Sequence, residues 1–303
     1  MLGSILLIIS STIMYSTPLV YGALGGLISE KSGVTNIGLE GMMIVGASTG
    51  VVVAAHTNNA WLGFLMAGLA GAVLALLHAI ASVTFKADQS VSGIAINLMG
   101  AGIALFLARM VFGSTNTPPV QTKLPRLFAD SSSLGVFSRL NFEMTSVIAL
   151  VLTIGLWILL TKTKWGLRIT AIGEHPVVAD TLGISVNKVR YACVIASGFL
   201  AGLGGASMTL SILSSFTPTA ISGHGFIALA AVIFGKWKPI SVYLSCLFFG
   251  FTQTVAIQFG AGSIIPTQIL AMLPYVLTLI VLVFFVGKSV GPKASGVPYE
   301  KGK

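Results

Sequence analysis

Long apolar segments alternate with short polar segments along almost the whole chain. Most of the apolar segments approach the roughly 20 residues that an α-helix needs to cross the hydrocarbon core of a bilayer. The seventh is shorter, and it fits either a broken helix or a half-helix beside a re-entrant stretch. The pattern predicts an all-α, polytopic transmembrane helix bundle of about nine spans, near residues 3–28, 37–56, 61–85, 91–113, 143–160, 189–212, 223–235, 240–258 and 267–287.

Composition agrees with a membrane protein. Of the 303 residues, 55% are hydrophobic and 8% are charged; a soluble domain carries about 25% charged residues. We expect one transmembrane domain over 1–287 and a Gly/Pro/Lys-rich tail over 288–303 that is disordered. The two cysteines, Cys193 and Cys246, both fall in apolar segments and are expected to be small buried side chains.

The distribution of cations predicts the orientation in the membrane. With the C-terminus in the cytoplasm, 13 of the 17 Lys and Arg residues fall on the inner side and 4 on the outer side. Cytoplasmic loops carry the excess of cations, so the N-terminus is expected outside. The cations that give a net charge of +9 lie at segment ends, which favours anionic membrane lipid over nucleic acid as their partner.

A polar loop at 161–188 lies between two long apolar segments. Cations flank it on both sides, which places it in the cytoplasm. Its middle predicts a short helix that begins at Glu174 to Pro176 and ends at Gly183. A short helix presented to the cytoplasm suits a docking partner. The candidate docking residues are Glu174, His175, Pro176, Ala179, Asp180 and Gly183.

Catalytic motifs are missing from the sequence. Residues 282–289 end in Gly-Lys-Ser but lack the leading glycine of a phosphate-binding loop. The four histidines are far apart and form no metal-binding motif, and no Gly-x-Ser-x-Gly elbow is present. We therefore expect no catalytic residue, no metal and no cofactor, and any ATP hydrolysis should take place on another chain.

A few polar residues inside the spans are candidates for a translocation path. Asn97 and Gln253 can line a path for a neutral solute or make interhelical hydrogen bonds. His224, flanked by glycines, can face a solute or simply form a tight helix entry. Glu40 can be a pathway carboxylate, but a position in a first helical turn, facing the positive dipole end, is the favoured interpretation. The shortage of buried acids weighs against an ion-coupled secondary transporter.

Glycine-rich stretches recur at 22–26, 68–71 and 198–205. They fit two pseudo-symmetric halves, as in many transporters, or a chance recurrence among 35 glycines. In both cases, small residues allow helices to approach closely within lipid.

Three motifs carry a resemblance to a known family. They are Ser-Gly-Val-Thr-Asn-Ile-Gly-Leu-Glu-Gly-Met-Met at 32–43, Ile-Gly-Glu-His-Pro with Ala-Asp-Thr-Leu-Gly-Ile at 172–184, and Gly-His-Gly-Phe through Phe-Gly-Lys-Trp at 223–237. The sequence resembles the permease subunits of bacterial ABC importers for branched-chain amino acids, ribose-like sugars and nucleosides. The first and third motifs look most like the nucleoside, or simple-sugar-type, branch. The residues of the first motif that carry the resemblance are Asn36, Gly38, Glu40 and Gly41.

The resemblance implies a type II-like ABC importer permease in the bacterial cytoplasmic membrane. It implies that the 161–188 loop holds the coupling helix that rests on a separate ABC ATPase subunit. It also implies a second permease chain, forming a heterodimer, and an extracytoplasmic substrate-binding lipoprotein. A nucleoside is the expected substrate, and a pentose or another simple sugar is the alternative.

Overall fold

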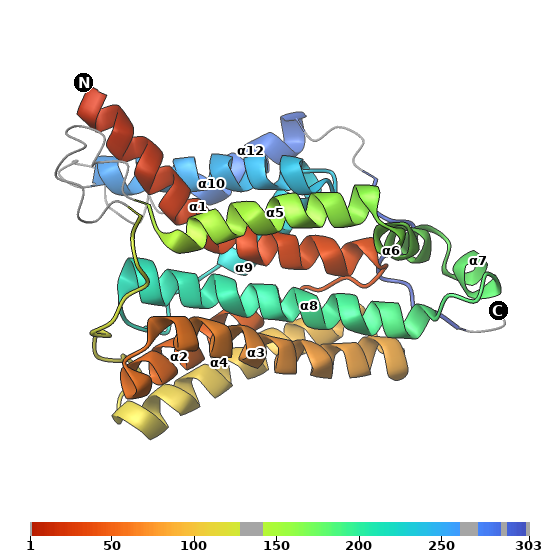
Figure 1. Ribbon diagram of the computed structural model, residues 1–303, viewed down its shortest axis with the longest axis horizontal. Coiled ribbons are helices and arrows are strands. Elements are labelled where there is room, and N and C mark those ends of the chain that lie inside the picture. Colours follow the sequence, from red (N-terminus) through yellow and green to blue (C-terminus); the bar gives the residue numbers. More distant parts are fainter. Residues whose placement is uncertain (1, 128–141, 261–271, 286–289, 301–303) are drawn as a thin grey trace.

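The computed structural model describes residues 2–127, 142–260, 272–285 and 290–300. The chain forms an elongated helical bundle whose two termini lie at opposite ends (Figure 1). Seven of the described helices are long and apolar enough to cross a membrane. They are α1 (Leu2–Lys31), α2 (Leu39–Thr57), α3 (Ala60–Ala79, continued by a π-helical turn to Thr84), α4 (Gln89–Phe112), α5 (Met144–Lys162), α8 (Val186–Ser207, continued by a π-helical segment to Leu213) and α10 (Pro239–Gly260).

Four further described helices are shorter: α6 (Lys164–Glu174), α7 (Pro176–Thr181), α9 (His224–Phe234) and α12 (Leu273–Phe285). The prediction of an all-α membrane bundle is confirmed. Eight of the nine predicted spans correspond to α1, α2, α3, α4, α5, α8, α9 and α10, and the described part of the ninth is α12. The segment 114–142 between α4 and α5 lies partly, and the segment 261–271 wholly, outside the described residues.

Local sequence signals set several helix boundaries. The Asn59 side chain accepts the backbone N–H groups of Trp61 and Leu62 at 3.0 and 3.1 Å, so α3 begins directly after it. The Asp88 carboxylate accepts the N–H of Val91 at 2.9 Å and begins α4 in the same way. Because the lipid interior offers no other acceptors, each span forms its backbone hydrogen bonds within its own helix. The positions of the spans can therefore be predicted from hydropathy.

Helix α9 has only 11 residues. At about 1.5 Å per residue it extends ~16 Å, roughly half of a hydrocarbon core about 30 Å thick. Of the two predictions for the seventh span, this length fits the half-helix. Gly223, directly before it, has a φ of +86°, a left-handed conformation that glycine adopts without a steric penalty.

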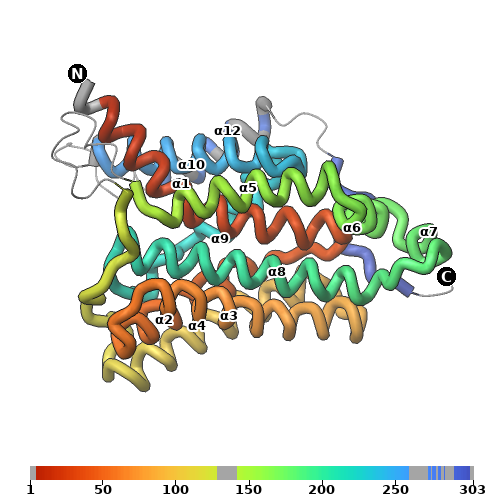
Figure 2. Tube along the Cα trace, viewed as in Figure 1, coloured from red at the N-terminus to blue at the C-terminus, as the bar shows by residue number. Residues whose placement is uncertain are grey.

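Helix α8 is the central element of the bundle. It packs against α1 on one side and against α2 and α3 on the other, and Figures 1 and 2 show it running between these helices. Most of α8 is buried, whereas α4 and α5 expose most of their surface. Glycines make this burial possible: a Cβ added at Gly202 would lie 2.2 Å from the Ala67 carbonyl oxygen of α3. A Cβ at Gly205 would lie within 2 Å of the Met43 carbonyl oxygen of α2.

The chain segment 290–300 differs from the disordered tail that its composition predicted. The backbone N–H of Ala294 donates to the Gly173 carbonyl at 2.8 Å, and the Arg190 guanidinium donates to the Val297 carbonyl at 3.2 Å. The hydroxyls of Thr35 and Ser295 are 3.0 Å apart. Composition could not indicate this order, because the partners lie far away in sequence. Residues 288, 289 and 301–303 are outside the described residues.

Candidate functional site

Helices α6 and α7 lie at the end of the bundle where the C-terminus lies, beyond the ends of the spans (Figure 1). His175 has φ −143° and ψ 77°, which ends α6, and Pro176 occupies the first position of α7. Gly183 follows α7 with a φ of +77°. The predicted short helix therefore corresponds to α7, while α6 was not predicted as a separate helix.

Helix α7 has one buried face and one exposed face. Ala179 is buried and packs with Ile172 and Val186, with Tyr299 of the tail against them. Val178 and, just after α7, Leu182 are 57% and 74% exposed and lie four residues apart, on one side of the segment. Exposed apolar side chains grouped in this way are typical of a docking surface.

The predicted docking residues occupy different positions around this surface. His175 and Gly183 are exposed, Glu174, Pro176 and Asp180 are partly buried, and Ala179 faces inward. Sequence reasoning missed the exposed apolar residues Val177, Val178 and Leu182. Their spacing in a short polar loop was the signal that could have identified them.

Tail residues connect α7 to the membrane bundle. Desolvation, followed by a hydrogen bond with the Asp180 carboxylate, raises the pKa of Tyr299 above its ordinary value. A neutral phenol can donate to this carboxylate. Next to it, the Lys86 ammonium lies 3.4 Å from the Glu300 carboxylate, and both side chains are substantially exposed. Such a surface pair adds little stability, so the apolar contacts of Tyr299 carry more of the attachment.

Glu40 joins the beginnings of two helices. It lies in the first turn of α2 and is 7% exposed. Its two carboxylate oxygens accept the backbone N–H groups of Gly223, at 2.6 Å, and Gly225, at 2.7 Å. These donors form the start of α9, so one carboxylate faces two positive helix ends. This geometry agrees with the favoured interpretation of Glu40 and adds a partner helix that the sequence did not indicate.

His224 and Gln253 lie together, as two of the predicted path residues. The two Nε2 atoms are 3.2 Å apart, and His224 Nδ1 lies 2.5 Å from the Ile221 carbonyl oxygen. A carbonyl only accepts, so Nδ1 carries the proton and Nε2 accepts from the Gln253 amide. His224 is buried and Gln253 is half-buried. The His224 ring therefore orients the Gln253 amide.

Asn97 has a different set of partners. Its Oδ1 accepts the N–H of Gly41 at 2.8 Å, and its Nδ2 donates to the Ile37 carbonyl at 3.0 Å. Both ends of the amide are therefore engaged with the start of α2. Asn97 thereby holds α4 against the segment that positions Glu40.

The 32–43 motif packs this same segment. Asn36 is fully buried, donates to the Ser197 hydroxyl of α8 at 2.9 Å, and accepts the N–H of Gly38 at 3.1 Å. A Cβ at Gly41 would lie 2.5 Å from the Ile96 carbonyl oxygen of α4. The motif residues therefore fix the α1–α2 segment between α4 and α8.

The fold places this chain in a class of membrane proteins. A solved chain described as part of a metal-chelate type ABC transporter, in an inward-facing conformation, has the same fold with a TM-score of 0.50. The match covers 92% of this chain and 84% of that chain at 14% identity. The protein thus has the fold of a type II-like ABC importer permease.

The chain belongs to the family of the branched-chain amino acid transport system / permease component, which matches residues 8–285. It is 45% identical to the guanosine ABC transporter permease protein NupQ of Bacillus subtilis (strain 168), over 98% of this chain and 97% of the relative. It is 41% identical to the nucleoside ABC transporter permease protein NupC of Lactococcus lactis subsp. cremoris (strain MG1363), over 98% of each. It also matches NupP, another guanosine ABC transporter permease protein of B. subtilis, at 24% identity over 90% of this chain and 80% of the relative.

These findings confirm the predicted family. The chain is a permease component, the non-catalytic membrane subunit of an ABC transporter. It is a multi-pass protein of the membrane.

Proposed function

We propose that this chain is one permease subunit of an ATP-driven nucleoside importer in the bacterial cytoplasmic membrane. The observation that supports this most is its similarity, over nearly its full length, to permeases named for guanosine and nucleosides. The Gln253 amide, which donates to the buried His224 imidazole, is a neutral polar group, and such a group suits the hydroxyls and base edge of a nucleoside. A pentose or simple sugar is the competing substrate that the test below distinguishes.

Three partners complete the proposed importer. An ABC ATPase docks on α6 and α7, where Val178 and Leu182 expose apolar surface. A second, different permease pairs with this chain, in line with the two guanosine permeases NupQ and NupP that both match it. An extracytoplasmic substrate-binding lipoprotein delivers the nucleoside from the outer side.

Reconstitution in liposomes tests this function. With the ATPase, the second permease and the binding protein, vesicles should accumulate radiolabelled guanosine when ATP is present on the cytoplasmic face. Without ATP, or with this chain alone under a proton or sodium gradient, they should not. Excess unlabelled nucleoside should compete and ribose should not. Competition by ribose alone would favour the sugar permease, and gradient-driven uptake by this chain alone would contradict the ABC mechanism.

Changing the exposed face of α7 should uncouple the ATPase. Leu182→Arg and Val178→Arg each place a charge on an apolar contact while leaving the buried face intact. Because central interface residues contribute about 2 kcal/mol or more, ATPase binding should weaken ~30-fold. Binding is measured by co-purification, and uptake in the same vesicles.

Two comparisons sharpen this docking test. Asn187→Arg, also exposed but at the start of α8, should bind the ATPase normally. Ala179→Arg should instead destabilise the permease, because Ala179 is 1% exposed. Normal co-purification of the Leu182 and Val178 variants would show that the ATPase docks elsewhere.

The proposed orientation, N-terminus outside and C-terminus cytoplasmic, predicts the accessibility of single cysteines. Thr57→Cys, at the end of α2, should react with an impermeant maleimide in intact cells. Lys293→Cys, in the tail, should react only after permeabilisation. Both native positions are exposed, and the two native cysteines are buried. The reverse labelling pattern would require the opposite orientation.

A further inference from the structure

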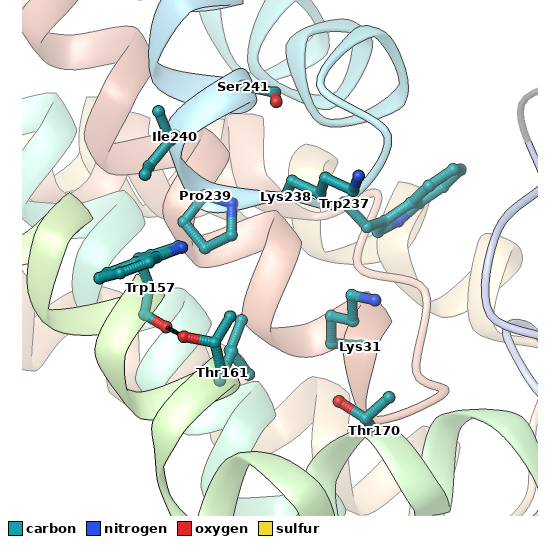
Figure 3. Close-up of a pocket in the computed structure, with 10 residues that line it drawn as sticks. Lys31, Trp157, Thr161, Thr170, Trp237, Lys238, Pro239, Ile240 and Ser241 are labelled. Atoms are coloured by element: carbon teal, nitrogen blue, oxygen red, sulfur yellow. Dashed lines mark hydrogen bonds between the residues drawn. The ribbon is translucent and has the colours of Figure 1, made fainter.

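A cavity of about 460 Å³ lies among α1, α5, α6 and the turn that leads into α10. Figure 3 shows Trp157 and Thr161 of α5 on one side, with Lys31 and Lys238 across from them. The ends of α1 and α5 and the start of α10 meet here, at the end of the bundle that carries α6 and α7. The cavity therefore lies at the border between the hydrocarbon core and the aqueous phase.

The cavity carries positive charge from two separate elements. Lys31 is the last residue of α1, and Lys238 directly precedes α10. Within the described residues, no carboxylate lies within 4.0 Å of either ammonium group. The Glu174 carboxylate stabilises the positive charge of Lys31, and the Lys238 ammonium opposes it. The nearby Glu30 carboxylate is engaged by the Trp237 indole N–H at 2.5 Å.

Hydrogen-bond donors add to this charge. Thr170 places a hydroxyl in the cavity wall, whereas the Thr161 hydroxyl donates to the Trp157 carbonyl at 2.6 Å and is not free to donate to a ligand. Helix α10 begins at Pro239, which has no N–H, so the first-turn N–H groups without an intrahelical acceptor are those of Ile240 and Ser241. The positive end of its dipole therefore adds to the two lysines. The combination suits a phosphate group.

The surroundings select a lipid as the source of that phosphate. Ile240 at the cavity, Leu244 one turn further along α10, and Ile158 on α5 are 47%, 59% and 45% exposed. Apolar surface thus continues from the cavity along the membrane-facing sides of two spans. Trp157 lies at the level where indole rings gather in membrane proteins. A ligand with an anionic head and apolar tails matches both parts, whereas a free phosphate matches only the first.

We propose that this cavity binds the phosphate headgroup of an anionic phospholipid, with its acyl chains along α5 and α10. Basic pockets between transmembrane helices on the cytoplasmic side are suited to such headgroups. The lipid would join the end of α1 to α5, α6 and α10, the elements next to the coupling surface. The proposal depends on the chain's place in the membrane and not on the transported substrate.

Native mass spectrometry of the purified permease, titrated with phosphatidylglycerol or phosphatidylcholine, tests the site. The wild type should retain phosphatidylglycerol preferentially. Lys31→Gln with Lys238→Gln should bind it ~30-fold more weakly, since each lysine near a membrane surface contributes about a factor of five. Lys236→Gln is the matched control, an exposed lysine two residues from Lys238 that does not line the cavity.

A further variant keeps the test valid if the double lysine variant misfolds. Ile240→Asp places a carboxylate at the cavity in the first turn of α10, where the helix dipole favours an acid. It should stay folded, as judged by gel filtration, and lose the preference for phosphatidylglycerol. Equal retention of both lipids by the wild type, or an equal loss in Lys236→Gln, would overturn the proposal. Displacement of the lipid by millimolar inorganic phosphate would identify a free-phosphate site instead.

Discussion

Glu40→Ala is expected to destabilise the permease more than any other change of a single charged residue discussed here. The variant leaves the N–H groups of Gly223 and Gly225 without their acceptor at a site where Glu40 itself is 7% exposed. Each orphaned donor costs about 1–3 kcal/mol, so two cost roughly 2–6 kcal/mol. The thermal unfolding midpoint in detergent should fall markedly, and less protein should accumulate in membranes.

Glu40→Gln separates the two hypotheses for this carboxylate. The new amide keeps one acceptor but turns an NH₂ group toward a backbone N–H. The stability of this variant should therefore lie between that of Glu40→Ala and that of the wild type. Glu174→Ala, at the end of α6, is the control and should unfold like the wild type. If Glu40→Ala and Glu40→Gln both unfold normally and only transport is lost, Glu40 is a pathway group and the helix-joining role is wrong.

The second large effect is expected from adding one methyl group at Gly205. A Cβ there would overlap the Met43 carbonyl oxygen of α2, and backbone cannot move aside as a flexible side chain can. Overpacking of this kind costs about 1–3 kcal/mol or more. Gly205→Ala should therefore lower the unfolding midpoint.

Gly155→Ala provides a matched comparison for Gly205. It also lies inside a helix, α5, but a Cβ there has no atom within 4 Å. Alanine favours a helix over glycine by about 1 kcal/mol, so this variant should be slightly stabilised. The two variants should thus shift the midpoint in opposite directions. Equal shifts would mean that α2 and α8 do not pack as closely as described.

The positions of the spans could be predicted because they depend on local physics. In lipid every backbone group must be satisfied within its own helix, so apolar length alone locates α1 to α5, α8 and α10 closely. The end of α7 could also be predicted from a local signal, because Gly183 directly after it adopts a φ of +77°. The glycine stretches at 68–71 and 198–205 were predicted to allow close packing, and they meet where α3 contacts α8.

The parts that were missed depend on contacts between distant residues. Ala179 packs inward against Ile172 of α6 and Val186 of α8, with Tyr299, 120 positions later in the chain, against the same cluster. The carboxylate of Glu40 was assigned to its own helix, but its partners belong to α9. Asn97 and Gln253 were grouped by residue type, yet Asn97 joins α4 to the start of α2, whereas Gln253 pairs with His224 of α9. Composition cannot distinguish such cases.

The tail gives α7 a second attachment, and this limits how the helix can move. Along the chain, α7 connects to the bundle through His175 on one side and Gly183 on the other, a pair of joints that would let it swing. Segment 290–300 links the two sides of α7, because it makes hydrogen bonds with Gly173 before α7, with Arg190 after α7 and with Thr35. A displacement of α7 is therefore expected to displace the end of α1 and the 32–38 segment that leads to Glu40 as well. We therefore expect α7, the docking helix proposed above, to move together with these segments and not independently of them.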